Sequence, residues 1–188
     1  MPETEWEEYK GVKASHPILA HQLSLRRRSA MFQEIGTFEF HPSQREKFKD
    51  GELLYEWANQ YPQLFDEQDL QIADHSNPAH FVEWLGAIHL FETTGYLSLV
   101  EKYEFKRHKR KQNILKEMVT VDVLSLISRR GVQCPDLFVY APDKTDWYFC
   151  EVKGPGDRLR PVQKKYFEEL SEASGKKIYI LKFKAIKT

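Results

Sequence analysis

The sequence has few cysteines, no long apolar run and no excess of either charge, and each absence excludes a class of protein. Cys134 and Cys150 are the only cysteines in 188 residues, too few for a disulfide framework and not spaced as a CxxC metal pair. The longest apolar run is the five residues 137–141, against the roughly 20 that span a bilayer. The acidic first eight residues are unlike a signal peptide. We therefore expect an intracellular protein, cytoplasmic or, in a eukaryote, nuclear, with no membrane partner.

The net charge is zero, from 28 basic and 28 acidic residues, so the whole molecule exerts no long-range attraction on a polyanion. The charges are nevertheless segregated along the chain. Residues 50–70 carry six acids and no Lys or Arg, residues 106–112 carry five permanent cations, and residues 151–188 carry ten Lys or Arg against five Asp or Glu. A nucleic-acid site is therefore expected in the second half, although a short basic run is as often a solvated helix face.

The composition, 41% hydrophobic and 30% charged, is that of a globular chain, and its patterns divide it at residues 75 and 76. Residues 1–75 are mostly helical in pattern and carry no chemical motif. Residues 76–188 alternate between helix and strand, which predicts an α/β domain. In this part we expect helices over 78–94, with Asn77 as the cap, and over 112–130 and 161–175, and strands over 96–105, 137–141, 147–153 and 177–183.

The strands 137–141 and 147–153 predict a hairpin, because residues 142–146 have the composition of a turn. In an antiparallel pair of strands, the residue numbers of any two opposed residues add to the same sum. A turn centred between Asp143 and Lys144 gives 287, which places Asp136 opposite Glu151, and the two-residue period adds Lys153 to the same face. Two opposed acids need a compensating cation, either Lys153 or a divalent metal, and carboxylate oxygens favour magnesium or manganese. On spacing alone, an ordinary salt-bridged sheet face is an equal alternative.

The residues around this hairpin extend the pattern. Pro135-Asp136 is followed by Glu151-Val152-Lys153-Gly154-Pro155-Gly156-Asp157-Arg158-Leu159 and then by Gln163. This resembles the PD-(D/E)XK nuclease superfamily, and within it the virus-type replication-repair nuclease (VRR-NUC) domain, including the version in the Fanconi-associated nuclease. The resemblance implies a restriction-endonuclease-like core, a central mixed sheet flanked by helices, with the helical extension at 1–75 and the nuclease domain at 76–188.

The resemblance also implies a metal-dependent phosphodiesterase that uses Mg²⁺ or Mn²⁺. Asp136, Glu151 and the Val152 carbonyl would be metal ligands, Lys153 would orient the attacking water, and Gln163 would belong to the same cluster. The family has a further acid on the helix before the sheet. We favour Glu83 over Glu92 for this role, because the dipole disfavours a carboxylate near the C-terminus of a helix.

For the function we expect a structure-selective DNA endonuclease that cuts branched DNA of the Holliday junction or flap type, as a homodimer on two-fold-symmetric substrates. Two alternatives are a non-catalytic nucleic-acid-binding module on the same fold and a defence nuclease that acts on foreign DNA. Phosphates would be held without base recognition by Lys106, Arg107, Lys109, Arg110, Lys111, Arg158, Arg160, Lys164 and Lys165.

Overall fold

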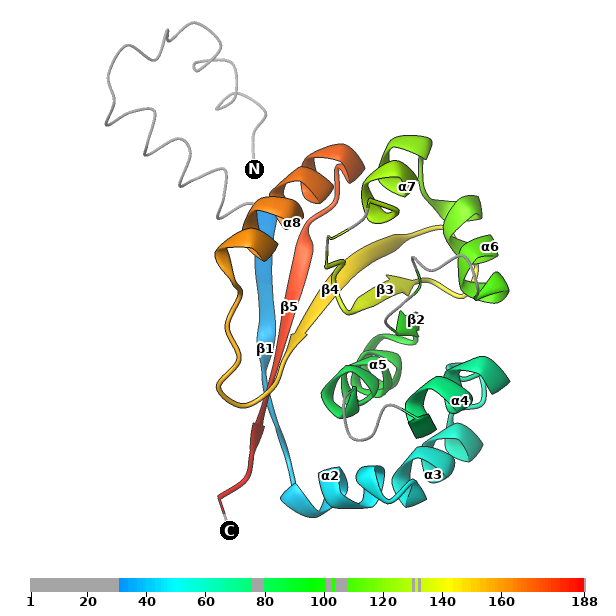
Figure 1. The fold of residues 1–188 in the computed structure, drawn as a ribbon, viewed down its shortest axis with the longest axis vertical. Coiled ribbons are helices and arrows are strands. Elements are labelled where there is room, and N and C mark those ends of the chain that lie inside the picture. The colour runs from blue at the N-terminus through cyan, green and yellow to red at the C-terminus, as the bar shows by residue number, and fades with distance from the viewer. Residues whose placement is uncertain are drawn as a thin grey trace, which may run out of the picture.

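The computed structural model describes residues 31–75, 80–100, 103, 108–129, 131 and 133–187. These residues form five strands and seven helices (Figure 1). The strands are β1 (Phe32–Phe40), β2 (Leu97–Val100), β3 (Leu137–Tyr140), β4 (Trp147–Lys153) and β5 (Ile178–Ala185). The helices are α2 (Pro42–Lys49), α3 (Glu52–Gln60), α4 (Glu67–His75), α5 (Phe81–Thr94), α6 (Lys109–Met118), α7 (Val121–Ile127) and α8 (Pro161–Ser174). Within the described ranges, no helix combines the length and the apolar character that a membrane span requires.

The five strands form one mixed sheet in the order β1-β5-β4-β3-β2. β5 pairs in parallel with both β1 and β4, whereas β3 pairs antiparallel with β4 and with β2. This architecture confirms the expected α/β fold with a central mixed sheet.

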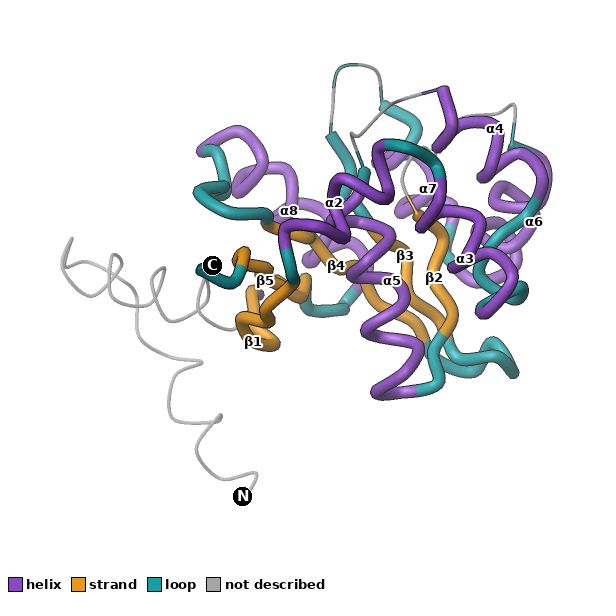
Figure 2. The backbone as a smooth tube through the Cα atoms, turned by 90° about the horizontal axis from the view of Figure 1, so that it is seen from below, coloured by secondary structure: helices purple, strands orange, loops and turns teal. Residues whose placement is uncertain are grey.

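Alternate residues of the central strands face opposite layers of helices. Leu137, Val139 and Cys150 pack with α2, α3 and α5, whereas Phe138 and Phe149 pack with α6, α7 and α8. Figure 1 shows these two groups of helices in the lower and the upper half, and Figure 2, seen from below, shows α5 lying across the strands. The sheet is therefore buried on both faces, as the continuous apolar sequence of β3 requires.

The hairpin formed by β3 and β4 has the predicted register. Leu137 pairs with Cys150 and Tyr140 with Trp147, which gives the index sum of 287. The turn is closed by two backbone hydrogen bonds, one from Ala141 N–H to the Asp146 carbonyl at 2.9 Å and one from Lys144 N–H to the Ala141 carbonyl at 2.8 Å. This closure fixes the register.

Two predicted elements differ from the structure. The helix expected over 112–130 is two helices, α6 and α7, because the chain becomes extended at Val119 and Thr120, and the Thr120 side chain caps α7 by accepting from Val123 N–H. Helix α5 begins at Phe81 after His80, and the expected cap at Asn77 and Pro78 lies outside the described residues.

The first segment, expected to be mostly helical, also contains a strand. β1 pairs along its length with β5, and helices α2 to α4 follow it as expected. The aromatic rings of Phe40 and Trp57 pack against Phe81 with centroid distances of 5.1 Å and 5.9 Å, and Phe65 stacks on Trp84 at 4.1 Å. The division of the chain at residues 75 and 76 stays a prediction, but its two sides share this core.

Candidate metal and active site

The hairpin brings two carboxylates together at its open end. Asp136 directly precedes β3, whose pairing with β4 begins at Leu137 and Cys150, and it lies in one pocket with Glu151 of β4. Both are buried, with 8% and 1% of their surface exposed. The Asp136 Oδ2 accepts a hydrogen bond from Val152 N–H at 2.8 Å, which fixes this carboxylate against the backbone of the neighbouring strand.

The Glu151 carboxylate is held on one oxygen only. Its Oε1 accepts from Lys153 Nζ at 2.5 Å and from Gln163 Nε2 at 3.0 Å. Gln163 lies in the first turn of α8, and its own Oε1 accepts from Arg160 N–H at 3.1 Å. Because the amide of Gln163 is engaged at both ends, its orientation is determined, and α8 is thereby attached to the acidic pair.

The second oxygen of Glu151, Oε2, is buried and accepts no hydrogen bond from any residue that the structure describes. The pKa of Glu151 is raised, because burial of the carboxylate outweighs the opposing effects of Lys153 and of Asp136. A buried carboxylate oxygen without a donor is costly, and a cation at this position would remove the cost.

Helix α5 contributes a third acid. Its Gly86 packs on β4, where a methyl group added to the glycine would lie 3.0 Å from Val152 Cγ2 and 3.3 Å from Leu181 Cδ2. This close approach brings Glu83, one turn earlier, into the pocket that contains Asp136 and Glu151.

Glu92, the competing acid on the same helix, lies elsewhere. It accepts a hydrogen bond from the hydroxyl of Tyr61, the residue that ends α3. Its role is therefore to join α5 to α3, and the geometry favours Glu83 as the acid of the site.

The pocket has a volume of about 280 Å³ and collects all five residues that the sequence predicts as catalytic. It is lined by Glu83, Gln133, Asp136, Glu151, Val152, Lys153, Asp157, Arg158, Arg160 and Gln163. The lining holds the four carboxylates of Glu83, Asp136, Glu151 and Asp157 and the three cations of Lys153, Arg158 and Arg160, which leaves one negative charge. Carboxylate oxygens with this charge fit a divalent ion such as Mg²⁺ or Mn²⁺.

The residues predicted to bind nucleic acid divide into three groups. Arg158 and Arg160 line the pocket, and Lys109, Lys164 and Lys165 are exposed. Lys106 and Arg107 lie outside the described residues.

Arg110, which is partly exposed, and Lys111, which is buried, are both paired with acids of the same chain. Arg110 binds Asp66 and Asp69 at 2.6 Å and 2.8 Å, and Lys111, 2% exposed, binds Asp69 at 2.6 Å. The expectation that Lys111 contacts DNA is therefore wrong, because its ammonium is enclosed and already neutralised. His108 lies in the same cluster.

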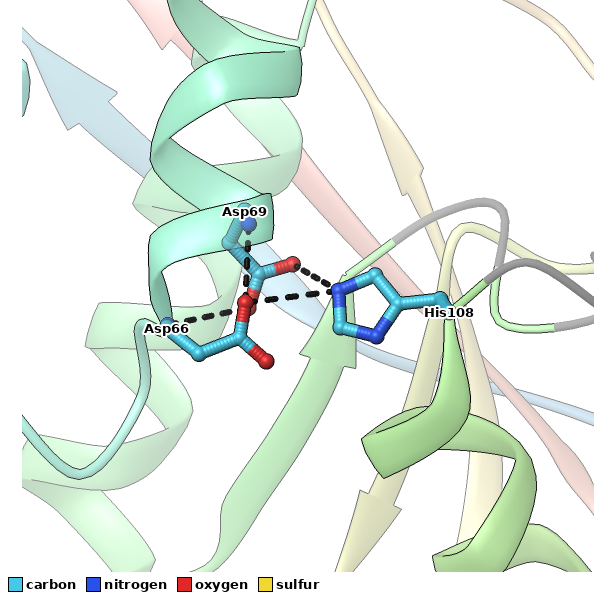
Figure 3. A group of neighbouring side chains, drawn as sticks. All are labelled: Asp66, Asp69 and His108. Atoms are coloured by element: carbon cyan, nitrogen blue, oxygen red, sulfur yellow. Dashed lines mark hydrogen bonds and ion pairs between the residues drawn. The ribbon is translucent and has the colours of Figure 1, made fainter.

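Asp66, Asp69 and His108 form a second group of potential metal ligands, which the sequence analysis missed (Figure 3). One ligand atom from each lies within 4.8 Å of the others, and His108 Nε2 is 3.4 Å from Asp66 Oδ1 and 3.3 Å from Asp69 Oδ1. The two aspartates are three residues apart at the start of α4, which is a recognisable spacing. The histidine comes from the start of α6, and no local pattern indicates that partner.

The charges of this cluster favour an ion-pair network over a metal site. The two carboxylates are already balanced by the two cations of Arg110 and Lys111. Burial, together with Lys111, lowers the pKa of His108, so its ring is neutral at pH 7. A divalent ion here would leave excess positive charge in a buried place. We therefore interpret the cluster as the connection between α4 and α6.

Comparison with known proteins assigns the family. The VRR-NUC domain family matches residues 89–182, a range that contains the hairpin, Lys153 and Gln163. The chain belongs to the VRR-NUC family. This membership supports a nuclease that acts on DNA, and it confirms the resemblance that the motif around Glu151 indicates.

A search of curated proteins found no match. Among solved structures, the chain is similar to one in the crystal structure of paFAN1 bound to DNA with a two-nucleotide 5′ flap and a gap. The identity is 18%, the TM-score is 0.28, and the alignment covers 77% of this chain and 22% of that chain. The chain thus spans about a fifth of that protein, and the family match alone carries the assignment.

Proposed function

We propose that this VRR-NUC chain is a divalent-metal-dependent endonuclease that hydrolyses phosphodiester bonds in branched DNA. The observation that carries the proposal is that Asp136 shares one pocket with Glu151, whose Oε2 is buried without a donor from the described residues. Lys153 and Gln163 complete the group on the same carboxylate. An ordinary salt-bridged sheet face would not leave a buried carboxylate oxygen without a donor.

Asp136, Glu151 and the Val152 carbonyl would hold the ion, with Glu83 facing it from α5. A bound divalent ion neutralises phosphate charge and makes a water molecule more acidic. Lys153 has two tasks that follow from its position. Its ammonium, 12% exposed and bonded to Glu151, remains available to orient the attacking water and to contact the phosphate, so it need not act as a free-amine base.

The cations beside the pocket suit a substrate recognised by shape. Arg158 and Arg160 precede α8 and line the pocket, and Lys164 and Lys165 are exposed near the start of α8. Contacts of this kind hold phosphates and carry no base code. This supports selection of a branched backbone, of the flap or Holliday junction type, over selection of a sequence. A homodimer would suit two-fold-symmetric junctions, and light scattering of the purified protein measures it.

The test is cleavage of fluorescent flap, fork, four-way junction and duplex substrates with Mg²⁺, Mn²⁺ or EDTA. We expect metal-dependent cleavage of the branched substrates in preference to duplex. Asp136→Asn should lower the rate at least about 100-fold, the scale of losing one electrostatic stabiliser. Asp146→Asn is the matched control, because Asp146 lies at the turn end of the same hairpin and pairs with Lys176.

Three results would overturn all or part of the proposal. Absence of cleavage by the wild-type protein on every substrate, with DNA binding retained, would favour the non-catalytic binding module. Cleavage that Asp136→Asn leaves unchanged would place the chemistry elsewhere. Preference for unbranched DNA with retained metal dependence would favour a defence nuclease over a junction enzyme.

A further inference from the structure

Tyr103 holds the peptide that carries Asp136. Its hydroxyl donates a hydrogen bond to the Pro135 carbonyl at 2.6 Å, and Pro135 is the residue immediately before Asp136. Tyr103 is fully buried, and its ring packs against Phe138 and Phe149 with centroid distances of 6.3 Å and 6.4 Å. The hydroxyl is therefore fixed in position by the core.

The backbone of Tyr103 is itself anchored. Gln112 of α6 donates from Nε2 to the Tyr103 carbonyl at 2.7 Å. Helix α6 in turn is joined to α4 through Asp69 and Lys111. A continuous set of contacts thus runs from the helices to the Pro135 carbonyl.

The bond from Tyr103 lies where the sheet no longer fixes the chain. The pairing of β3 with β4 and with β2 begins at Leu137, and Pro135 lies two residues before it. The Asp136 carboxylate is bound to Val152 N–H at one oxygen. The Tyr103 hydroxyl supplies a second constraint, on the carbonyl of the preceding residue, Pro135.

We propose that Tyr103 is a positioning residue for Asp136, holding the Pro135 carbonyl so that the carboxylate is preorganised for a divalent ion. The inference rests on the proposed function. Partners one shell outside a metal ligand orient that ligand, and their loss typically weakens metal binding by about 10- to 100-fold. The motif around Glu151 does not include Tyr103, although the residue lies within the range that the family matches.

The test is the dissociation constant of Mn²⁺, measured by electron paramagnetic resonance on the full chain without DNA. Tyr103→Phe removes only the hydroxyl, and we expect the constant to rise by about 10-fold or more. The Mn²⁺ concentration for half-maximal cleavage should rise by the same factor, while the rate at saturating Mn²⁺ stays within about threefold of wild type. Loss of folded protein alone would lower the rate at every metal concentration.

Tyr148→Phe is the matched control, since Tyr148 lies on β4 and its hydroxyl makes no hydrogen bond with the residues that the structure describes. An unchanged Mn²⁺ constant in folded Tyr103→Phe overturns the inference and leaves the proposed function standing. A wild-type protein that neither binds Mn²⁺ nor cleaves DNA overturns the proposed function instead. If Tyr103→Phe does not fold, Gln112→Ala replaces it, and we expect its Mn²⁺ dissociation constant to rise as well. An unchanged Mn²⁺ constant in folded Gln112→Ala then overturns the inference.

Discussion

Replacement of Lys111 by methionine tests whether this residue of the basic run is buried and paired inside the molecule. The Lys111 and Asp69 side chains are 2% and 1% exposed, with Nζ 2.6 Å from Oδ1, and Nζ also donates to the Val100 carbonyl at 2.6 Å. Removing one partner of a buried pair costs about 3–5 kcal/mol, because the other charge stays buried. Arg110 still binds Asp69 in the variant, so we expect a loss near the lower end of this range, about 3 kcal/mol.

The assay is urea unfolding at 25 °C, followed by tryptophan fluorescence and analysed for two-state behaviour. Lys47→Met is the control, because it makes the same substitution in an ion pair with Glu52 whose side chains are 48% and 56% exposed. An exposed pair contributes about 0–1 kcal/mol. Equal losses in the two variants would refute the burial of Lys111, and so would a DNA affinity that falls in Lys111→Met under conditions where the variant is folded.

The other expectations concern α5 and the buried histidine. Glu83→Gln should reduce cleavage by about 10- to 100-fold while Glu92→Gln stays near wild type, and the reverse order would move the acid of the site to Glu92. Gly86→Ala should lower stability by about 1–3 kcal/mol by overpacking, as measured by urea unfolding, because its added methyl group meets Val152; an unchanged midpoint would contradict the close approach. Burial lowers the pKa of His108 below its ordinary 6.5. The unfolded chain therefore binds a proton at this residue more readily than the folded chain does, and the free energy of unfolding should fall as pH drops below about 6.5. His108→Gln should flatten that slope between pH 5.5 and 7.5, and an unaltered slope would exclude His108 as its source.

The hairpin and its acids could be predicted because they depend on local information. A turn composition over residues 142–146 fixes the index sum, and the sum alone places Asp136 opposite Glu151. Gln163 follows from the motif, and its position in the first turn of α8 brings it to Glu151. Each of these steps spans fewer than 30 residues.

Contacts between distant segments could not be predicted in this way. β1 is an edge strand whose exposed positions weaken the apolar alternation, and its parallel partner β5 lies more than 130 residues later. The packing of Gly86 on β4 likewise decides that Glu83 reaches the pocket. A helical wheel of α5 shows only that the helix is apolar on most sides.

The sequence shows that the charges are segregated, but only the fold shows that some of these opposite charges bind each other. The acidic stretch 50–70 supplies Asp66 and Asp69, which bind Arg110 and Lys111 of the basic run. Two of the five cations of the run, Arg110 and Lys111, are therefore neutralised within the molecule, whereas Lys109 of the same run is exposed.

Four of the described cations predicted to bind DNA lie near the pocket, just before or at the start of α8: Arg158, Arg160, Lys164 and Lys165. Lys109 is exposed on α6. Each phosphate contact contributes about −0.9 to the slope of log K against log salt. Four contacts predict a slope of about −4 by this rule, with little change in Lys111→Met and a reduction of about one in Lys164→Met. DNA contact by the Lys111 ammonium would give the opposite ranking, so the salt dependence of these two variants separates a cation that holds the fold together from a cation that faces the substrate.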